Sequence, residues 1–269
     1  MKAKHVIILK HTTIILLIVF CFSCSSKRTD TKDEQIVAIN TIEDETPNDS
    51  ASNSISGNVA MSQIPTFPNN IILTGLVNHR LVSIYKQRQQ GNTTIVDDIR
   101  QKVSYSEYEG SDNVEYTHYM PGIDILSGYK LLNISHYDFT LEKQNLFFNK
   151  PVLIKTLYYP SFEQDSINKI AVNRNYYLVS VYDEDTNKDT VINKKDLRHF
   201  YYFDETATTK TIILPKDYSV MRSQYDYGKD IMYLFAKLDV NKNGIIDKNE
   251  PLHIFWIDLK NPQKGKRLY

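Results

Sequence analysis

Two twelve-residue segments, loop 1 (residues 185–196) and loop 2 (residues 239–250), carry oxygen-bearing side chains at regular intervals. In loop 2 these side chains stand at positions 1, 3, 5, 9 and 12, with Gly244 at position 6 and an aliphatic residue at position 8. Ca²⁺ prefers about six to eight hard oxygen ligands, and alternate residues of a tightly turned loop direct several side chains to one centre. Gly244 suits the turn because a Cβ hinders the required backbone conformation. The spacing therefore predicts a calcium site.

In this spacing both loops resemble the calcium-binding loop of the EF-hand family, and the resemblance implies which residues are ligands, with the residue at position 7 contributing its backbone carbonyl oxygen. Those of loop 2 are Asp239, Asn241, Asn243, Ile245, Asp247 and Glu250. Those of loop 1 are Asp185, Asn187, Asp189, Val191, Asn193 and Asp196. The aliphatic residues at position 8, Ile192 and Ile246, are expected to pack inward and tie each loop to the domain.

Loop 1 departs from this pattern at two positions. Thr190 stands where loop 2 has its turn glycine, which costs some backbone strain. Asp196 is one methylene shorter than Glu250 at the closing position, so it must approach an ion more closely or bind through one oxygen. Loop 1 is therefore expected to bind calcium more weakly than loop 2. The alternative for each loop is a solvated polar hairpin turn rich in Asn, Asp and Lys.

Both loops resemble the calcium-binding loop of the EF-hand family, and the closing Asp196 is similar to the loops of dockerins. This resemblance implies Ca²⁺ as the cofactor. Dockerin repeats are helical and closely spaced, whereas the two loops here are 54 residues apart. A cohesin partner is therefore not expected.

The spacing of 54 residues is an internal repeat that extends beyond the ligand positions. His199 falls on His253 and Tyr202 on Trp256, so the aromatic residues that follow the two loops repeat with them. The repeating unit, at about residues 177–204 and 231–258, is a strand, an acidic loop and a second strand. The two equivalent histidines are also candidates for a metal pair, although ordinary strand positions explain them as well.

The flanking segments indicate an all-β domain over residues 64–269. All 19 tyrosines and the single tryptophan lie there, in short β-branched or aromatic runs separated by polar segments. Clear runs are residues 81–85, 150–159, 176–182, 199–203 and 253–257. An antiparallel meander is expected, arranged either like a propeller or as a two-sheet sandwich. The ending Ile257-Asp258-Leu259 is similar to blades of Tol-type propellers, although about 205 residues hold few blades.

The N-terminus predicts export. Three lysines precede a short apolar stretch, which is typical of a signal peptide over residues 1–23. Ser23-Cys24 resembles the lipobox of bacterial lipoproteins, in which the cysteine is acylated, for example with palmitate, although Cys21 replaces the usual aliphatic residue. Residues 24–63 are polar and predict a disordered tether. Acidic residues close behind Cys24 resemble Bacteroidetes-type lipoproteins, which implies an outer-membrane location facing the periplasm or the outside.

The composition argues against several classes of function. After Cys24 the chain has no cysteine, so disulfides and thiolate chemistry are unavailable to the domain. No basic patch points to nucleic acid, and no catalytic motif is recognisable. We expect a calcium-binding, non-enzymatic lipoprotein of the cell envelope, anchored to the membrane by its lipid. Its many tyrosines are candidates for a surface that binds a protein or glycan ligand, although ordinary cross-strand pairs explain them as well. The alternative is an exported hydrolase, or a subunit of one, with structural calcium.

Overall fold

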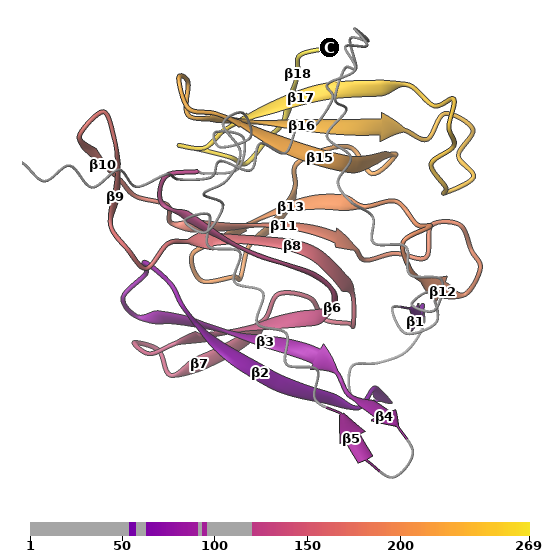
Figure 1. Ribbon diagram of the computed structural model, residues 1–269, viewed down its shortest axis with the longest axis horizontal. Coiled ribbons are helices and arrows are strands. Elements are labelled where there is room, and N and C mark those ends of the chain that lie inside the picture. The colour runs from indigo at the N-terminus through magenta and orange to yellow at the C-terminus, as the bar shows by residue number, and fades with distance from the viewer. Residues whose placement is uncertain (1–53, 58–62, 91–92, 96–119) are drawn as a thin grey trace, which may run out of the picture. The chain divides into compact units, whose positions relative to one another are not determined.

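The structure is a computed structural model that describes residues 54–57, 63–90, 93–95 and 120–269 (Figure 1). The expected signal peptide, Cys24 and most of the expected tether lie outside these residues. Every described residue belongs to one compact unit, Glu45–Tyr269. No helix in the described ranges is long and apolar enough to cross a membrane.

The described residues form β-strands and no α-helix, and all strand pairs are antiparallel, which confirms the expected fold class. The five apolar runs named above all become strands. The strands are β1 (Ile55–Ser56), β2 (Thr66–Leu73), β3 (His79–Lys86), β4 (Arg88–Gln90), β5 (Thr93–Ile95), β6 (Ile123–Asp138), β7 (Lys143–Leu146), β8 (Leu153–Pro160), β9 (Asp165–Ile167), β10 (Ile170–Val172), β11 (Tyr176–Tyr182), β12 (Val191–Ile192), β13 (His199–Asp204), β14 (Lys210–Ile212), β15 (Tyr218–Asp226), β16 (Ile231–Leu238), β17 (Leu252–Asp258) and β18 (Lys266–Arg267).

The largest sheet has eight strands in the order β14-β13-β11-β8-β6-β3-β2, with β7 also paired to β6. Its longest strand, β6, pairs with β8 along its first half and with β3 along its second half. The register shifts between Ser127 and Leu131, where β6 passes from one partner to the other. In Figure 1, β8, β11 and β13 lie in one layer and β2, β3 and β7 in another, with β6 running between them.

A second sheet, in the order β15-β16-β17-β18, faces the large one across a hydrophobic core. Leu178 and Phe200 of the large sheet and Leu234 and Ile257 of the four-stranded sheet belong to this core. The other face of β11 contributes Tyr177 and Val179 to a second core inside the large sheet. Because both of its faces are covered, β11 is apolar along almost its whole length. This packing of two sheets corresponds to the sandwich alternative.

The two repeat units are built alike but differ in register. In the first, β11 pairs with β13, and Val181 stands opposite His199. In the second, β16 pairs with β17, and Ala236, rather than Phe235, stands opposite His253. The pairing of β16 with β17 is therefore shifted by one residue from the pairing that the 54-residue repeat predicts. This shift gives His199 and His253 different surroundings, although the sequence aligns them.

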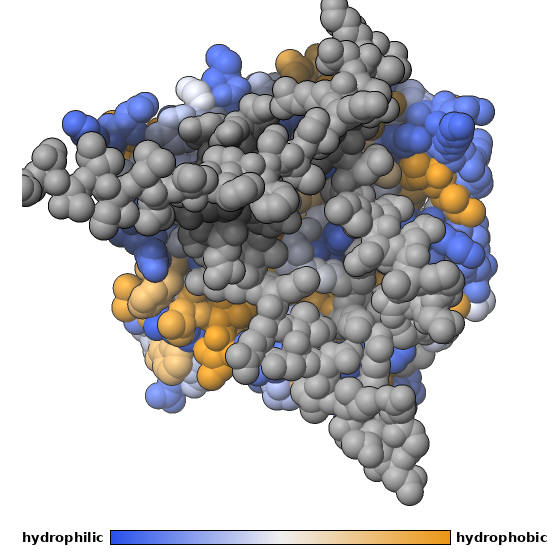
Figure 2. Space-filling model, viewed as in Figure 1, coloured by the Kyte–Doolittle hydropathy of each residue, from blue (hydrophilic) through white to orange (hydrophobic). Residues whose placement is uncertain are grey.

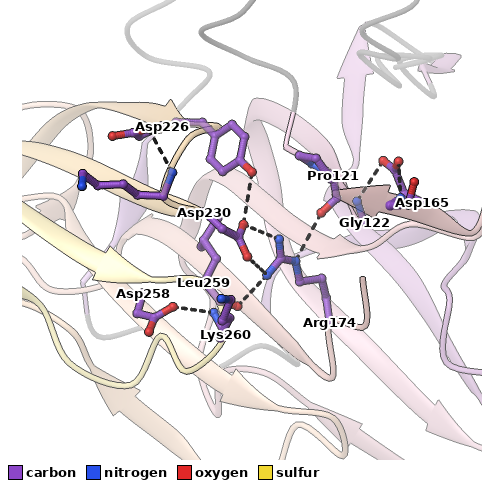
Figure 3. A network of polar contacts seen from close by, with 12 residues as sticks. Pro121, Gly122, Asp165, Arg174, Asp226, Asp230, Asp258, Leu259 and Lys260 are labelled. Carbon is purple, nitrogen blue, oxygen red and sulfur yellow. Dashed lines mark hydrogen bonds and ion pairs between the residues drawn. The ribbon is translucent and has the colours of Figure 1, made fainter. Parts of the chain in front are cut away.

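A buried ion pair joins the two sheets at one end (Figure 3). The Arg174 guanidinium, just before β11, donates to both Asp230 carboxylate oxygens at 2.6 and 3.1 Å and to the carbonyls of Pro121 and Leu259. Tyr225 donates a further hydrogen bond to Asp230. The Asp230 backbone is left-handed, with φ of 55°, in the turn between β15 and β16. The pair has its hydrogen bonds satisfied on several sides, as a buried charge pair requires.

An apolar groove lies on the outer face of the large sheet. It has a volume of about 460 Å³ and is lined by residues of β2, β3, β6 and β7, among them Ile71, Val82 and Tyr137, and by Phe139, which directly follows β6. Figure 2 shows apolar residues gathered on this side of the molecule, over the ends of β2, β3 and β7. Neither loop 1 nor loop 2 contributes a residue to this groove.

Candidate metal centre

Loop 1 joins β11 to β13, and loop 2 joins β16 to β17, so each connects two antiparallel neighbours of one sheet. In Figure 1 both loops lie on the same side of the domain. They touch: the Thr186 hydroxyl of loop 1 donates to the Gly244 carbonyl of loop 2 at 2.7 Å. The structure therefore brings together the two sets of predicted ligands, which belong to different sheets.

The two loops follow the same backbone course. Position 4 is left-handed in both, with φ of 61° at Lys188 and 57° at Lys242. Position 6 is also left-handed, with φ of 74° at Thr190 and 77° at Gly244. Gly244 adopts this conformation at low cost, whereas it is strained at Thr190, because a β-branched residue rarely adopts it. The tight turn is thus kept in loop 1 although its residue disfavours it.

Four hydrogen bonds from backbone N–H groups to side-chain oxygens recur at matching positions of the two loops. The carboxylate at position 1 accepts from the N–H groups of positions 5 and 6, as in the 2.9 Å bond from Thr190 to Asp185 and the 2.8 Å bond from Gly244 to Asp239. The side chain at position 3 accepts from position 5, and that at position 5 accepts from position 7. These bonds fix side-chain oxygens inside the turn in the order that the sequence predicts.

The closing carboxylates at position 12 return to the start of each loop. Asp196 accepts from the N–H groups of Thr186 and Asn193, and Glu250 accepts from those of Val240 and Asp247. Asp196 is only 2% exposed. Burial raises the pKa of Asp196 above its ordinary value, and its hydrogen bonds offset this only in part. Burial thus disfavours the ionised form of Asp196, and a nearby cation would stabilise that form.

The remaining predicted ligands lie at the exposed side of the loops. At position 9, Asn193 accepts from the N–H of Lys195, and Asp247 accepts from the side-chain amides of Asn241 and Asn243. At position 8, Ile192 is 1% exposed and packs in a small core, as predicted, while Ile246 is only half-buried.

The residue types of each loop fit calcium. Each has three carboxylates, two asparagine amides and one backbone carbonyl at the ligand positions, and all of these are hard oxygen donors. In the part of the chain that the structure describes, no three His, Cys, Asp or Glu side chains are grouped so that they could hold a metal ion. A site here would accordingly need amide and carbonyl oxygens as well as carboxylates.

Thr186 is a functional candidate that the sequence did not reveal. Its hydroxyl lies 3.2 Å from Asp196, accepts a hydrogen bond from the N–H of Leu197, and reaches Gly244 of the other loop. A Cβ added to Gly244 would stand 2.0 Å from the Thr186 carbonyl oxygen, so the two loops meet backbone to backbone. The repeat gives no sign of this contact, because the position equivalent to Thr186 is Val240.

A buried polar network lies directly before loop 1. The Asp183 carboxylate is 2.6 Å from Nδ1 of His199 and accepts a hydrogen bond from the Tyr201 hydroxyl at 2.8 Å. Nε2 of His199 faces the Lys216 carbonyl oxygen at 3.1 Å. Since both ring nitrogens face acceptors, the imidazole is held in its protonated form. His253 instead contacts the Tyr218 hydroxyl within the four-stranded sheet, so the two histidines have different hydrogen-bond partners.

We expect the Asp183–His199 pair to give a stability that depends on pH. Burial alone would lower the pKa of His199, but Asp183 raises it above its ordinary value. Burial alone would raise the pKa of Asp183, but His199 and Tyr201 hold it below its ordinary value. The stabilisation is therefore complete between about pH 4 and 6.5, falls as pH rises through the folded pKa of His199, and falls as pH drops through that of Asp183.

Urea unfolding of the unmodified protein and of His199→Gln checks this expectation. The difference in unfolding free energy between the two should be largest near pH 5–6 and should shrink toward pH 9, as the imidazole loses its proton in the folded protein. A difference that stays constant from pH 5 to 9 would show that folding does not raise the pKa of His199.

Comparison with protein families and with curated proteins finds no relative of this chain. No protein-family model matches the chain, and no curated protein matches it.

Proposed function

We propose that this protein is a calcium-binding, non-enzymatic lipoprotein of the cell envelope. Ca²⁺ acts in it as a structural staple, meaning an ion that holds two chain segments together, here the two ends of each loop. The observation that carries the proposal is the matched geometry of loops 1 and 2. Both keep left-handed residues at positions 4 and 6 and the same six hydrogen bonds to ligand-type side chains, even where Thr190 disfavours the turn.

A structural role is favoured over a sensor role by what flanks the loops. Sensor proteins of the EF-hand type carry helices that change their angle when calcium binds. Here both ends of each loop continue into strands that are hydrogen-bonded to each other. Such strands have little freedom to swing apart. Ca²⁺ would instead reduce the repulsion among three carboxylates in each loop and stabilise the folded state through its binding free energy.

The envelope location is supported by the sequence. The apolar stretch, Ser23-Cys24 and the polar residues that follow are typical of an exported, lipidated chain. An exported domain without cysteines has access to millimolar calcium and has no disulfides to stabilise it. The apolar groove between β2, β3, β6 and β7 is a surface on which such a module would meet a ligand.

The alternative of a calcium-stabilised hydrolase would be favoured by loops that border a cleft lined by carboxylates. The apolar groove has no acidic lining residue, and a smaller cavity beside Arg174 has Glu163 as its acidic residue. Loops 1 and 2 line neither of these two cavities.

Thermal unfolding with EDTA and then with added Ca²⁺ tests the proposal. With free Ca²⁺ at ten times the dissociation constant, each loop should add about 1.4 kcal/mol to the unfolding free energy. In a domain of this size, that raises the midpoint temperature by about 3–6 °C per loop. An identical midpoint with EDTA and with millimolar Ca²⁺ would contradict the proposal.

Two variants test whether the calcium-induced rise in the midpoint temperature comes from loops 1 and 2. Glu250→Gln removes the closing carboxylate of loop 2 and should abolish the larger part of the shift, while Asp196→Asn should abolish the smaller part. Glu163→Gln is the matched control, because Glu163 is an exposed carboxylate outside both loops, and it should leave the shift unchanged. A shift that survives both loop variants would place the calcium elsewhere.

A further inference from the structure

Loop 1 is covered by a segment that comes from far away in the chain. Ile55 and Ser56 form β1, which pairs antiparallel with Ile192 and Val191, the residues at positions 8 and 7 of loop 1. The Gly57 N–H donates to the Thr190 carbonyl, at position 6, at 2.8 Å. Residues 54–57 fall within the range that the sequence assigned to a disordered tether, yet they are part of the folded unit. No strand among the described residues pairs with the equivalent positions of loop 2.

Burial of Ile55 explains why this segment is held. Its side chain is 3% exposed and packs in a small core with Ile192, Leu132, Leu153 and Tyr182. Full burial of an aliphatic side chain stabilises by about 1.5–3 kcal/mol. The Lys86 ammonium also donates to the Ser54 carbonyl at 3.3 Å. The inward residue of loop 1, Ile192, thus has the tether-derived Ile55 as a packing partner.

The pairing also orients the loop backbone. In an antiparallel pair, successive residues direct their N–H and C=O groups alternately toward and away from the partner strand. Because the carbonyl of Thr190 faces β1, the backbone groups of Val191 face the opposite way. In agreement, the Val191 N–H donates to Asp189 inside the loop at 3.0 Å. The Val191 carbonyl is the predicted position 7 ligand, so β1 holds this oxygen away from itself and on the side of the ligand-bearing residues.

The segment also reaches the first ligand position. A Cβ added to Gly57 would stand 3.2 Å from Cβ of Asp185 and 3.5 Å from its Oδ2. The same Oδ2 accepts the hydrogen bond from the Thr190 N–H at 2.9 Å. Residues 54–57 therefore contact loop 1 at positions 1, 6, 7 and 8, although none of them supplies a side-chain ligand.

We propose that docking of residues 54–57 and occupancy of loop 1 by Ca²⁺ are coupled, so that each strengthens the other. The inference rests on the calcium-binding function proposed above and assigns its regulation at loop 1. A segment that pre-organises the site lowers the ordering cost of binding, and by reciprocity the bound ion holds the segment. Because Ser54 follows Cys24, the proposed lipid-attachment residue, by 30 positions in the sequence, calcium would set whether residues 54–57 are docked on the domain.

Calcium titration of the full-length protein in a Glu250→Gln background, where loop 1 is the remaining site, tests the coupling. Ile55→Asn should raise the calcium dissociation constant of loop 1 by about fivefold or more. Ser56→Asn introduces the same side chain at the neighbouring exposed position and should change it less than about twofold. Equal calcium affinities of the Ile55→Asn protein and its parent, measured by isothermal titration calorimetry, would overturn the inference.

Hydrogen exchange in the otherwise unmodified chain gives a second measurement that needs no change in the segment. Calcium should slow amide exchange at Ile55 and Gly57, and Asp196→Asn should abolish this protection. Calcium binding without any slowing would reject the coupling while leaving the proposed function intact. A chain that binds no calcium at either loop would reject both.

Discussion

Replacing Arg174 by Met should lower the unfolding free energy by about 3–5 kcal/mol, since the change leaves the charge of Asp230 buried without its partner. The side chains of the pair are 1% and 8% exposed, so water cannot take over the lost contacts. Arg174 also bridges the two sheets through the Leu259 carbonyl. Equilibrium unfolding in urea measures the loss.

The exposed pair between Lys216 and Glu184 provides a matched control. It has the same nitrogen-to-oxygen distance of 2.6 Å, but its side chains are 61% and 41% exposed. Lys216→Met should therefore cost about 0–1 kcal/mol. Replacing both partners, as in Arg174→Met with Asp230→Leu, should recover much of the loss because no buried charge remains. Equal losses from Arg174→Met and Lys216→Met would mean that the guanidinium is not buried between the sheets.

The second large effect is expected at Gly244. Gly244→Ala should cost about 3 kcal/mol or more, because the left-handed backbone penalises a Cβ by about 1–2 kcal/mol and the new atom would also collide with loop 1. The added Cβ would stand 2.0 Å from the Thr186 carbonyl oxygen and 2.7 Å from the Asn187 nitrogen, which are backbone atoms. The loops would have to separate, so calcium binding should weaken at both of them.

Thr190 is the equivalent position in loop 1 and gives the opposite expectation. Thr190→Gly relieves a left-handed threonine whose side chain is exposed, and it should stabilise the protein by about 0.5–1 kcal/mol after the greater freedom of glycine in the unfolded chain is counted. Thermal unfolding of both variants in EDTA measures these effects without calcium. A Gly244→Ala protein as stable as its parent would show that the two loops are not in contact.

The sequence by itself determined the strands and the order of the ligand-type residues. The runs of β-branched and aromatic residues at 176–182 and 199–203 become β11 and β13, because period and residue type are local properties of the chain. The left-handed turn at Gly244 was readable for the same reason, since few residues other than glycine adopt it at low cost.

The repeat predicted two equivalent units, but only the tertiary structure decided how they differ. The one-residue difference in ladder register places His199 beside Asp183 and His253 beside Tyr218. Register depends on which side chains a face must bury and on the partners that are available, and these come from the neighbouring strands.

Around loops 1 and 2, too, the sequence predicted some features and only the tertiary structure decided the others. Spacing alone placed oxygens at positions 1, 3, 5, 9 and 12 of each loop. The meeting of Thr186 with Gly244, and the docking of Ile55 on Ile192, join residues 58 and 137 positions apart. Such contacts depend on how the sheets pack and not on local sequence, because the energy of burying an apolar side chain is the same whichever distant segment supplies it. The sequence therefore determined the predicted ligands and their order, and the packing of the sheets decided what lies against them.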